Sequence, residues 1–149
     1  MIRRFQRRDL GELHQLDQVC FSPEVAYSKS DLKYFLANPR CSCWIAQGPQ
    51  QELAGFIILE RARRGGVPSG HIVTIDVNPA ERRRGVGSLL MHTAEEQMKQ
   101  EGITLMSLEV AANNIAAQTF YRGLGFITSG RIANYYGGRI DAESMEKAI

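Results

Sequence analysis

The residues with the clearest chemical potential lie in an arginine- and glycine-rich stretch between positions 78 and 88. Arg82, Arg83 and Arg84 come directly before Gly85 and Gly87, where an apolar periodicity that predicts a long helix begins. The first N–H groups of a helix lack acceptors within the helix and carry about half a positive charge, so a helix start binds anions. Glycines let the backbone approach such a ligand, and arginines add charge-assisted donors. The stretch therefore predicts a site for a diphosphate and a further phosphate.

Two other phosphate-binding motifs fail on this stretch. A Walker loop needs Gly-x-x-x-x-Gly-Lys followed by Ser or Thr, which the chain lacks, and a dinucleotide fingerprint needs a small residue where Leu90 stands. A solvated basic turn is the structural alternative. The position of the stretch between a predicted strand and a predicted helix favours a ligand, because open sheets bind ligands at such junctions.

Three further side chains could take part in proton transfer or line a site. Glu109 ends an otherwise apolar strand, where burial would raise the pKa of its carboxyl group and where it could act as a general base. Tyr121 lies seven residues beyond Asn114, about 10 Å along a helix, and its hydroxyl could act as a general acid. The alternatives are a solvent-facing or arginine-paired Glu109 and a Tyr121 that only packs in the core. We expect His71 to be a hydrogen-bonded strand histidine, although it could line an acceptor cleft.

The elements that would hold these residues follow from hydrophobic periodicity and turn residues. A strand over 71–77, a helix over 86–101 and a strand over 104–110 predict a right-handed crossover between parallel strands. Asp9 and Glu12 match a capping box opening the first helix. The other expected strands are 2–6, 42–47, 53–63, 126–132 and 140–145, and the other expected helices are 10–20, 30–37 and 115–123. The predicted class is α+β: a mixed, mostly antiparallel sheet of six or seven strands with about four helices.

Composition narrows the class of protein. The 149 residues predict one domain over 1–149, and a formal charge of +2 is too small for nucleic-acid or anionic-membrane binding by bulk electrostatics. Cys20, Cys41 and Cys43 have neither zinc spacing nor a disulfide pattern, so we expect free thiols in a reducing cytoplasm and no metal site. The longest aliphatic run is Phe56–Leu59, and the sequence therefore predicts neither a signal peptide nor a membrane span.

Several motifs, in order along the chain, resemble one enzyme superfamily. Arg82-x-x-Gly85-x-Gly87, after Val77-Asn78-Pro79, is similar to the acyl-coenzyme-A loop of the GNAT N-acetyltransferases. The segments 108–117 and 120–126 resemble that family's second cofactor segment. More narrowly, Leu108-Glu109-Val110 with Tyr121, and Asn134-Tyr135-Tyr136, resemble ribosomal-protein alanine N-acetyltransferases and the catalytic subunits of protein N-terminal acetyltransferases.

The resemblance implies the GNAT fold and an acetyl-CoA-dependent N-acetyltransferase, with Glu109 as general base and Tyr121 as general acid. The residues implied to contact acetyl-CoA are Ile75, Asp76, Val77, Arg82, Arg83, Arg84, Gly85, Val86, Gly87, Ser88 and Asn114. Those implied to form an acceptor-peptide cleft are Phe21, Pro23, Tyr27, Tyr135 and Tyr136. The chain departs from the family pattern at Asp76, where relatives have a small apolar residue, and over 141–147, where a polar segment replaces an apolar last strand.

The pKa of the acceptor amine bears on its identity. An α-amino group titrates near ~7.8 and a lysine side chain near ~10.4, so a lysine amine costs about 3.5 kcal/mol more to deprotonate at neutral pH. One glutamate therefore suits the N-terminal α-amine of a protein such as a ribosomal protein. We expect a monomer or weak homodimer that needs no nucleic acid or membrane. The alternatives are a lysine, polyamine, amino acid or antibiotic acceptor, and a non-catalytic ligand- or nucleic-acid-binding module.

Overall fold

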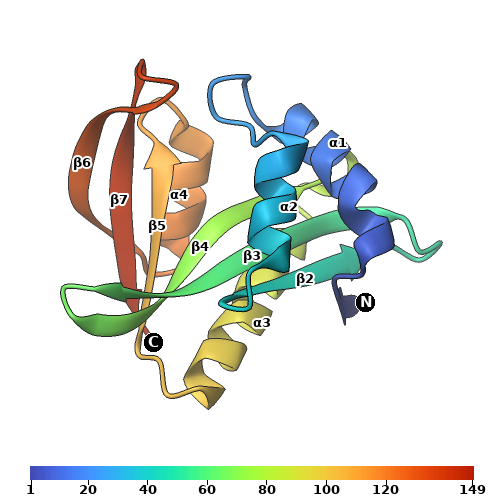
Figure 1. Cartoon of the computed structure of the whole chain (residues 1–149), viewed down its shortest axis with the longest axis horizontal. Helices are drawn as coiled ribbons and strands as arrows, with labels where there is room; N and C mark the ends of the chain where they lie inside the picture. The colour runs from blue at the N-terminus through green and yellow to red at the C-terminus, as the bar shows by residue number, and fades with distance from the viewer.

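One seven-stranded sheet organises the chain, which the computed structural model describes over residues 1–149 (Figure 1). The strand order is β1-β2-β3-β4-β5-β7-β6, and every neighbouring pair is antiparallel except β4–β5, which is parallel. The strands are β1 (Ile2–Arg4), β2 (Cys41–Gln47), β3 (Leu53–Arg64), β4 (Val67–Val77), β5 (Leu105–Ala111), β6 (Ile127–Tyr136) and β7 (Ile140–Ala148). The predicted α+β class and the parallel crossover are confirmed.

The two faces of the sheet each carry a pair of α-helices. On one face lie α1 (Leu10–Cys20) and α2 (Lys29–Ala37), and on the other lie α3 (Val86–Gln100) and α4 (Ile115–Gly123) (Figure 1). Side chains cap two of the helix starts: Ser28 Oγ accepts the Asp31 N–H at 3.0 Å, and Asn114 Oδ1 accepts the Ala117 N–H at 3.1 Å. None of the helices has the length and apolar character that a membrane crossing requires.

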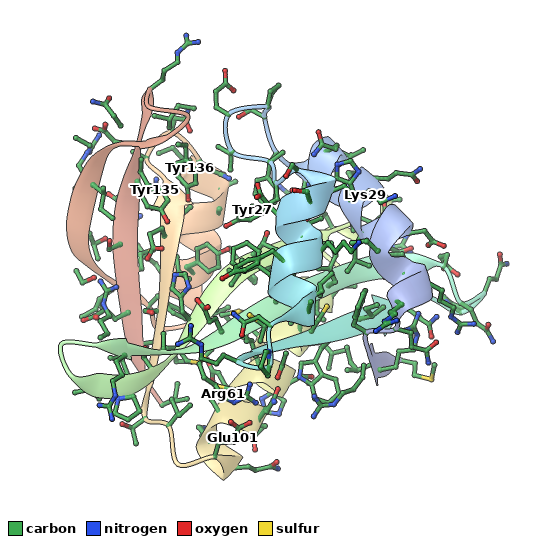
Figure 2. All side chains as sticks on the ribbon, viewed as in Figure 1. Tyr27, Lys29, Arg61, Glu101, Tyr135 and Tyr136 are labelled. Carbon is green, nitrogen blue, oxygen red and sulfur yellow. The ribbon has the colours of Figure 1, made fainter.

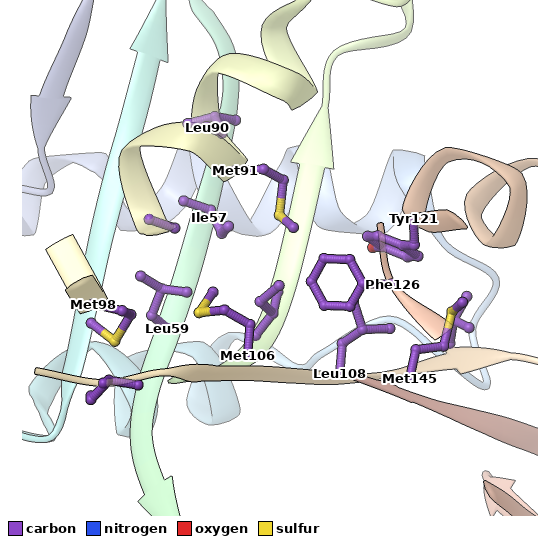
Figure 3. Close-up of a cluster of buried hydrophobic side chains, with 14 of the residues drawn as sticks. Ile57, Leu59, Leu90, Met91, Met98, Met106, Leu108, Tyr121, Phe126 and Met145 are labelled. Atoms are coloured by element: carbon purple, nitrogen blue, oxygen red, sulfur yellow. The ribbon is translucent and has the colours of Figure 1, made fainter. Parts of the chain in front are cut away.

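Strand β3 supplies both halves of the core. Phe56 and Ile58 face α1 and α2, whereas Ile57 and Leu59 face α3 and α4, and all four are buried. Successive side chains of a strand point to opposite faces, so one apolar strand can fill two clusters. Figure 3 shows the cluster on the α3–α4 face, where Met98 of α3 lies near Leu59.

Strands β4 and β5 stay paired over only a short length. Their parallel pairing ends at Ile72 opposite Leu108, although β4 continues to Val77. The ladder between β4 and β3 skips Val73 at the same point. Beyond Ile72 the edge of β4 that faces β5 therefore has no strand partner, and a space opens at the carboxyl end of the parallel pair, where sheets of this kind bind ligands.

The predicted capping box at the first helix is wrong. The Asp9 side chain makes no cap hydrogen bond to α1; its carboxylate instead accepts the Gln6 N–H at 2.7 Å and the Arg3 guanidinium at 2.8 Å. The bidentate pair with Arg3 gives this carboxylate stronger, charge-assisted partners than a helix N–H would. The carboxylate therefore links β1 to the 3₁₀ turn Arg7–Asp9 and does not cap α1.

Three strands differ in extent from the prediction. β4 begins at Val67, which makes the β3–β4 hairpin longer, and β6 continues to Tyr136, which places both predicted tyrosines on a strand rather than in a loop. The polar C-terminal segment forms β7, which pairs with both β5 and β6. It does so because Ala142 and Met145 are fully buried and Ser144 is buried beside them, while Glu143, Glu146 and Lys147 are only partly buried.

Candidate active site

A cavity of about 320 Å³ lies where β4 and β5 separate. Its walls come from these two strands, from α4, from the end of β6, and from the end of α1 with the loop that follows it. Seven residues predicted from the sequence line it: Phe21, Tyr27, Ile75, Glu109, Asn114, Tyr121 and Tyr136. The cavity thus collects side chains from Cys20 to Tyr136, which are far apart in the chain.

Glu109 and Tyr121 reach this cavity from opposite faces of the sheet. Leu108 and Val110, the neighbours of Glu109 in β5, point into the cluster against α3 and α4, so Glu109 points toward the α1–α2 face. Tyr121 belongs to α4 and packs in the α3–α4 cluster. Two reacting molecules, one bound on each face of the sheet, would therefore meet between β4 and β5, beside both Glu109 and Tyr121.

The Glu109 carboxylate has two polar neighbours. Its Oε1 lies 2.8 Å from His71 Nε2 and accepts the Tyr135 hydroxyl at 3.3 Å. Burial raises the pKa of this carboxyl, but the contacts with His71 and Tyr135 and the positive charge of Arg64 outweigh burial and leave the pKa below its usual value. The predicted upward shift is therefore wrong, because the sequence showed the burial and not the partners. Glu109 is ionised at neutral pH and available to accept a proton.

Tyr121 combines a core position with access to the cavity. The residue is only 9% exposed, and its ring meets Phe126 edge-to-face with 5.9 Å between centroids. Burial raises the pKa of its hydroxyl, which therefore keeps its proton at neutral pH. Tyr121 therefore packs in the core, and it also lines the cavity, where its hydroxyl could act as the predicted acid.

The start of α3 presents backbone N–H groups without helical acceptors. Leu89 is the first residue of this helix whose N–H reaches a carbonyl at the helix start, that of Gly85 at 3.0 Å. Gly85 has φ +80° and Arg83 has φ +66°, so the chain turns through the left-handed region just before the helix. A Cβ added at Gly85 would meet nothing within 4 Å. Open space in front of a row of free amides fits a diphosphate.

The exposed side chain of Arg84 beside these amides is available for an anion. Arg84 keeps 71% of its side chain exposed and has only a long contact of 3.7 Å with Glu81. Arg82 follows the 3₁₀ turn Pro79–Glu81, and its N–H bonds weakly, at 3.5 Å, to Pro79. The donor set of this loop, guanidinium groups beside backbone amides, is therefore the one that the diphosphate of a coenzyme A needs. The predicted phosphate contacts of residues 82–88 remain a prediction.

Two other residues of the implied cofactor site lie differently. Ile75 lines the cavity, but Asp76 does not; its side chain is 1% exposed and shares the α1–α2 face with its register partner Phe56. Val77 also lies outside the lining, and its carbonyl oxygen accepts the Cys20 thiol at 3.4 Å. Only backbone contacts with a ligand are thus open to Asp76.

The tyrosines of the predicted acceptor cleft come from two separate segments. Tyr27 ends the loop between α1 and α2, and its hydroxyl donates to the Val73 carbonyl at 3.3 Å. Figure 2 shows Tyr27 beside α2, with Tyr135 and Tyr136 at the end of β6 across from it. Tyr136 lines the cavity, whereas Tyr135 lies outside the lining and contacts Glu109. Pro23 is exposed and does not line the cavity.

His71 is the partner that sequence reasoning left unassigned. It is hydrogen-bonded, as expected of a strand histidine, and its partner is the candidate base itself. The register of the parallel pair places His71 opposite Ser107, two residues from Glu109 on the same face. Without the register, the sequence alone could not make that connection.

Comparison with known proteins shows the family of this chain. The model of the acetyltransferase (GNAT) family matches residues 10–126. The chain belongs to this family. The catalytic subunit of the N-terminal acetyltransferase B complex of Arabidopsis thaliana is 31% identical over 106 residues, which span 70% of this chain and 61% of that relative. The catalytic subunit ard1 of the N-terminal acetyltransferase A complex of Schizosaccharomyces pombe is 32% identical over 124 residues, 78% of this chain and 70% of that relative.

Solved structures share the fold. The ribosomal-protein-S18-alanine N-acetyltransferase of Escherichia coli superposes with a TM-score of 0.86 at 24% identity, covering 100% of this chain and 93% of that one. Naa20 of Chaetomium thermophilum, solved with a bisubstrate analogue, gives a TM-score of 0.83 at 25% identity, covering 100% and 86%. The predicted family, fold, enzyme class and acetyl-CoA cofactor are confirmed. When bound, acetyl-CoA supplies a thioester acetyl group that an amine can attack.

Proposed function

We propose that this protein acetylates the N-terminal α-amine of a peptide or protein. The observation that carries the proposal is the cavity between β4 and β5, which brings Glu109 from one face and Tyr121 from the other to a common space. The relatives named above as N-terminal acetyltransferase subunits support it. The start of α3 supplies the amides and arginines for the diphosphate on the same side as Tyr121.

The strength of the base favours an α-amine over a lysine. A carboxylate whose pKa is held below its usual value is a weak base. An α-amine is already partly neutral at pH 7, whereas a lysine amine must be deprotonated at a cost of about 3.5 kcal/mol more. Glu109 therefore has to take up a proton only as the amine forms its new bond, directly or through a water molecule.

Each side chain has one task in this scheme. Glu109 accepts the proton that the amine loses, and His71 holds its carboxylate in place at 2.8 Å. Tyr121 keeps its proton at neutral pH and donates it to the sulfur that leaves. Residues 82–88 hold the diphosphate, and Ile75, Asp76 and Val77 contact the acyl arm through their backbone. Asn114 caps α4 and lines the cavity, so it lies within reach of the same arm.

The acceptor enters from the α1–α2 face. Phe21 and Tyr27 form one wall and Tyr136 the other, with Tyr135 beside the base. An apolar and aromatic opening of this kind suits the first residue of an extended peptide, such as the N-terminus of a ribosomal protein. We place the reaction in the cytoplasm, where the three cysteine thiols stay reduced, and assign it to a monomer or weak homodimer.

A peptide library varied at its first two positions, incubated with acetyl-CoA and analysed by mass spectrometry, tests the acceptor. We expect the acetyl group on the α-amine of the first residue. Matched peptides with a blocked N-terminus and an internal lysine serve as the control and should remain unmodified. Acetylation confined to lysine side chains, or to polyamines and aminoglycosides, would overturn the proposal.

Two variants test the assigned roles. Glu109→Gln and Tyr121→Phe should each lower kcat by about 100-fold or more, the usual contribution of a positioned acid or base. Tyr121→Phe retains the ring that packs on Phe126, so its stability should remain close to that of the parent. Tyr34→Phe, at a tyrosine that is 67% exposed, is the matched control. Full turnover with an unchanged pH profile in either variant would remove that residue from the mechanism.

A further inference from the structure

A pair of buried carboxyl groups lies beneath the acceptor side of the cavity. Asp17 of α1 is 0% exposed and Asp76 of β4 is 1% exposed. No lysine or arginine forms a salt bridge with either of them. Two ionised carboxylates without a cation are not tolerated in such a place, because burial and mutual repulsion both oppose the second charge.

The hydrogen bonds of the pair leave one oxygen of each residue without a partner. Asp17 Oδ2 accepts the Tyr27 N–H at 2.7 Å, and Asp76 Oδ1 accepts the Thr74 hydroxyl at 2.7 Å. The remaining oxygens, Asp17 Oδ1 and Asp76 Oδ2, are buried and have no donor. The two side chains are within hydrogen-bonding reach of one another, so a single proton between these oxygens would satisfy both.

We propose that Asp17 and Asp76 share one proton, and that this proton ties the acceptor wall of the cavity, through Tyr27, to strand β4. Asp76 Oδ2 carries the proton and donates it to Asp17 Oδ1, which leaves Asp17 Oδ2 free to hold the Tyr27 backbone. Tyr27 is fixed to β4 a second time by its hydroxyl, which donates to the Val73 carbonyl. Its ring lines the cavity, so the shared proton positions a wall of the acceptor site.

The other groups around the pair agree with a single proton. Burial raises the pKa of Asp76, and Asp17 adds to the effect, while Thr74 and the charge of Arg82 oppose it. The remaining titratable neighbours are Cys20 of α1, Cys43 of β2, Tyr27, and Tyr121 of α4. Burial raises the pKa of each of these thiols and phenols, so all four are neutral at pH 7 and add no charge to the pair.

The pair makes a prediction about stability with a definite sign. An Asp in the unfolded chain has released its proton above about pH 4, whereas the folded protein retains one on the pair. Folding therefore takes up a proton, and this contribution to stability falls as pH rises from about 4 toward the raised pKa of Asp76. Asp76→Asn offers the same hydrogen bond without a proton, because its amide can donate to Asp17 while its oxygen accepts from Thr74.

Amide variants provide the first test, in assays that need no acetyl transfer. The advantage of Asp76→Asn over the parent in Tm should grow between pH 5 and pH 8. Asp17→Asn keeps one donor between the residues and should also fold. The double variant Asp17→Asn/Asp76→Asn places two NH₂ groups face to face and should melt below either single variant. A double variant as stable as the singles, or a Tm difference that is flat with pH, would overturn the proposal.

Infrared spectroscopy gives a direct second readout. The parent at neutral pH should show the C=O stretch of one protonated carboxyl, sensitive to exchange into ²H₂O, and both single amide variants should lack it. Its absence from the parent would overturn the shared proton. Neither this measurement nor the melting series depends on the acetyl acceptor, so they separate failure of the pair from failure of the proposed function.

The kinetic consequence rests on the proposed function. Above the raised pKa of Asp76, the protonated fraction falls tenfold per pH unit, and the apparent affinity for the acceptor falls with the competent fraction. The ratio of acceptor KM between the parent and Asp76→Asn should therefore rise by up to tenfold per pH unit at alkaline pH. The titration of the acceptor amine cancels in that ratio, and a constant ratio would contradict the positioning role.

Discussion

Glu109 illustrates, at the scale of single residues, that burial alone does not decide the state of a carboxyl group. Desolvation is the largest single influence on its pKa, yet His71, Tyr135 and Arg64 together reverse the outcome. A hydrogen bond to the charged form of an acid stabilises that form, and several of them exceed the cost of a partly buried position. The consequence is a base that is ready at neutral pH but weak, which matches an acceptor amine that needs little help.

His71 can be tested as the residue that positions this base. His71→Ala removes the contact that most opposes burial, so the pKa of Glu109 should rise. A base works only when deprotonated, and the acid limb of the pH–rate profile should therefore move to higher pH, by roughly one unit for each 1.4 kcal/mol of lost interaction. Steady-state kinetics between pH 4 and pH 9 would measure the shift.

His92→Ala is the matched control for this prediction. His92 lies on α3, is exposed, and does not line the cavity, so its removal should leave the acid limb in place. If His71→Ala also left the limb in place while lowering kcat, the histidine would act in some other step. A limb that moved to lower pH would contradict the electrostatic account of Glu109.

The sequence predicted residue types better than residue environments. Glu109, Tyr121 and Asn114 all line one cavity, and the roles that the resemblance implies for them stay predictions. Nothing in one sequence, however, gives the register between strands, and the register is what brings His71 to Glu109. The sequence marks Asp76 as a departure from its relatives, but it does not mark Asp17 as buried, because an acidic residue on a helix normally faces solvent.

At the scale of elements, the start of α3 shows why two nearby glycines serve different ends. Gly85 has a positive φ, which glycine adopts without strain, and open space in front of it. This turn leaves the first amides of α3 exposed. At Gly87 a Cβ would lie 3.0 Å from Phe120 Cζ, so that glycine lets α3 approach α4. The first glycine shapes a ligand site, and the second shapes the packing that holds the site beside Tyr121.

A pair of glycine variants separates strain from ligand binding. Gly85→Ala and Gly102→Ala each force an L-residue into the left-handed region, at φ +80° and +78° and with nothing within 4 Å of the added Cβ. Both should lose similar stability, about 1–2 kcal/mol. Only Gly85→Ala should raise the KM for acetyl-CoA, by about tenfold if a similar energy is lost from diphosphate binding.

A short thioester without the diphosphate, S-acetylpantetheine, completes that experiment. Its KM should be the same for the parent and for Gly85→Ala, because the amides at the start of α3 would not contact it. Equal increases in the KM for both thioesters would instead indicate a general distortion of the cavity. An increase in Gly102→Ala as large as that in Gly85→Ala would show that strain alone explains the effect.

Elements were predictable where local signals were complete. α3 and α4 begin within a residue of their expected positions because glycine and asparagine mark those starts. The β3–β4 hairpin and β6 are longer than expected because their extra residues are held by pairing across the sheet, which periodicity does not register. β7 was expected over 140–145 despite its polar composition, and its pairing with both β5 and β6 extends it to Ala148.

At the scale of the whole molecule, the single sheet links two cores that share no side chains. Phe56 and Ile57 are adjacent in β3 and point into different clusters. Ion pairs add further links across elements: Arg61 of β3 with Glu101 at the end of α3, both labelled in Figure 2, and Lys147 of β7 with Glu95 of α3 at 2.7 Å. Since β4 and β5 pass between both cores, the cavity exists only when both are formed.

This dependence predicts that the chain unfolds as one unit. The sole tryptophan, Trp44 of β2, donates to Gln97 of α3 at 2.7 Å and so reports the α3 side of the sheet. Leu32 is fully buried on the opposite side of the sheet. Leu32→Ala should lower the free energy of unfolding by about 2–5 kcal/mol. The fluorescence transition of Trp44 should nevertheless shift by the same amount as the far-ultraviolet circular dichroism, because both follow one cooperative event.

Val19→Ala, at a residue of α1 that is 66% exposed, should move neither transition. Were Leu32→Ala to shift the dichroism and leave the fluorescence unmoved, the two faces would fold separately, and an acceptor wall could melt while the diphosphate site remained intact.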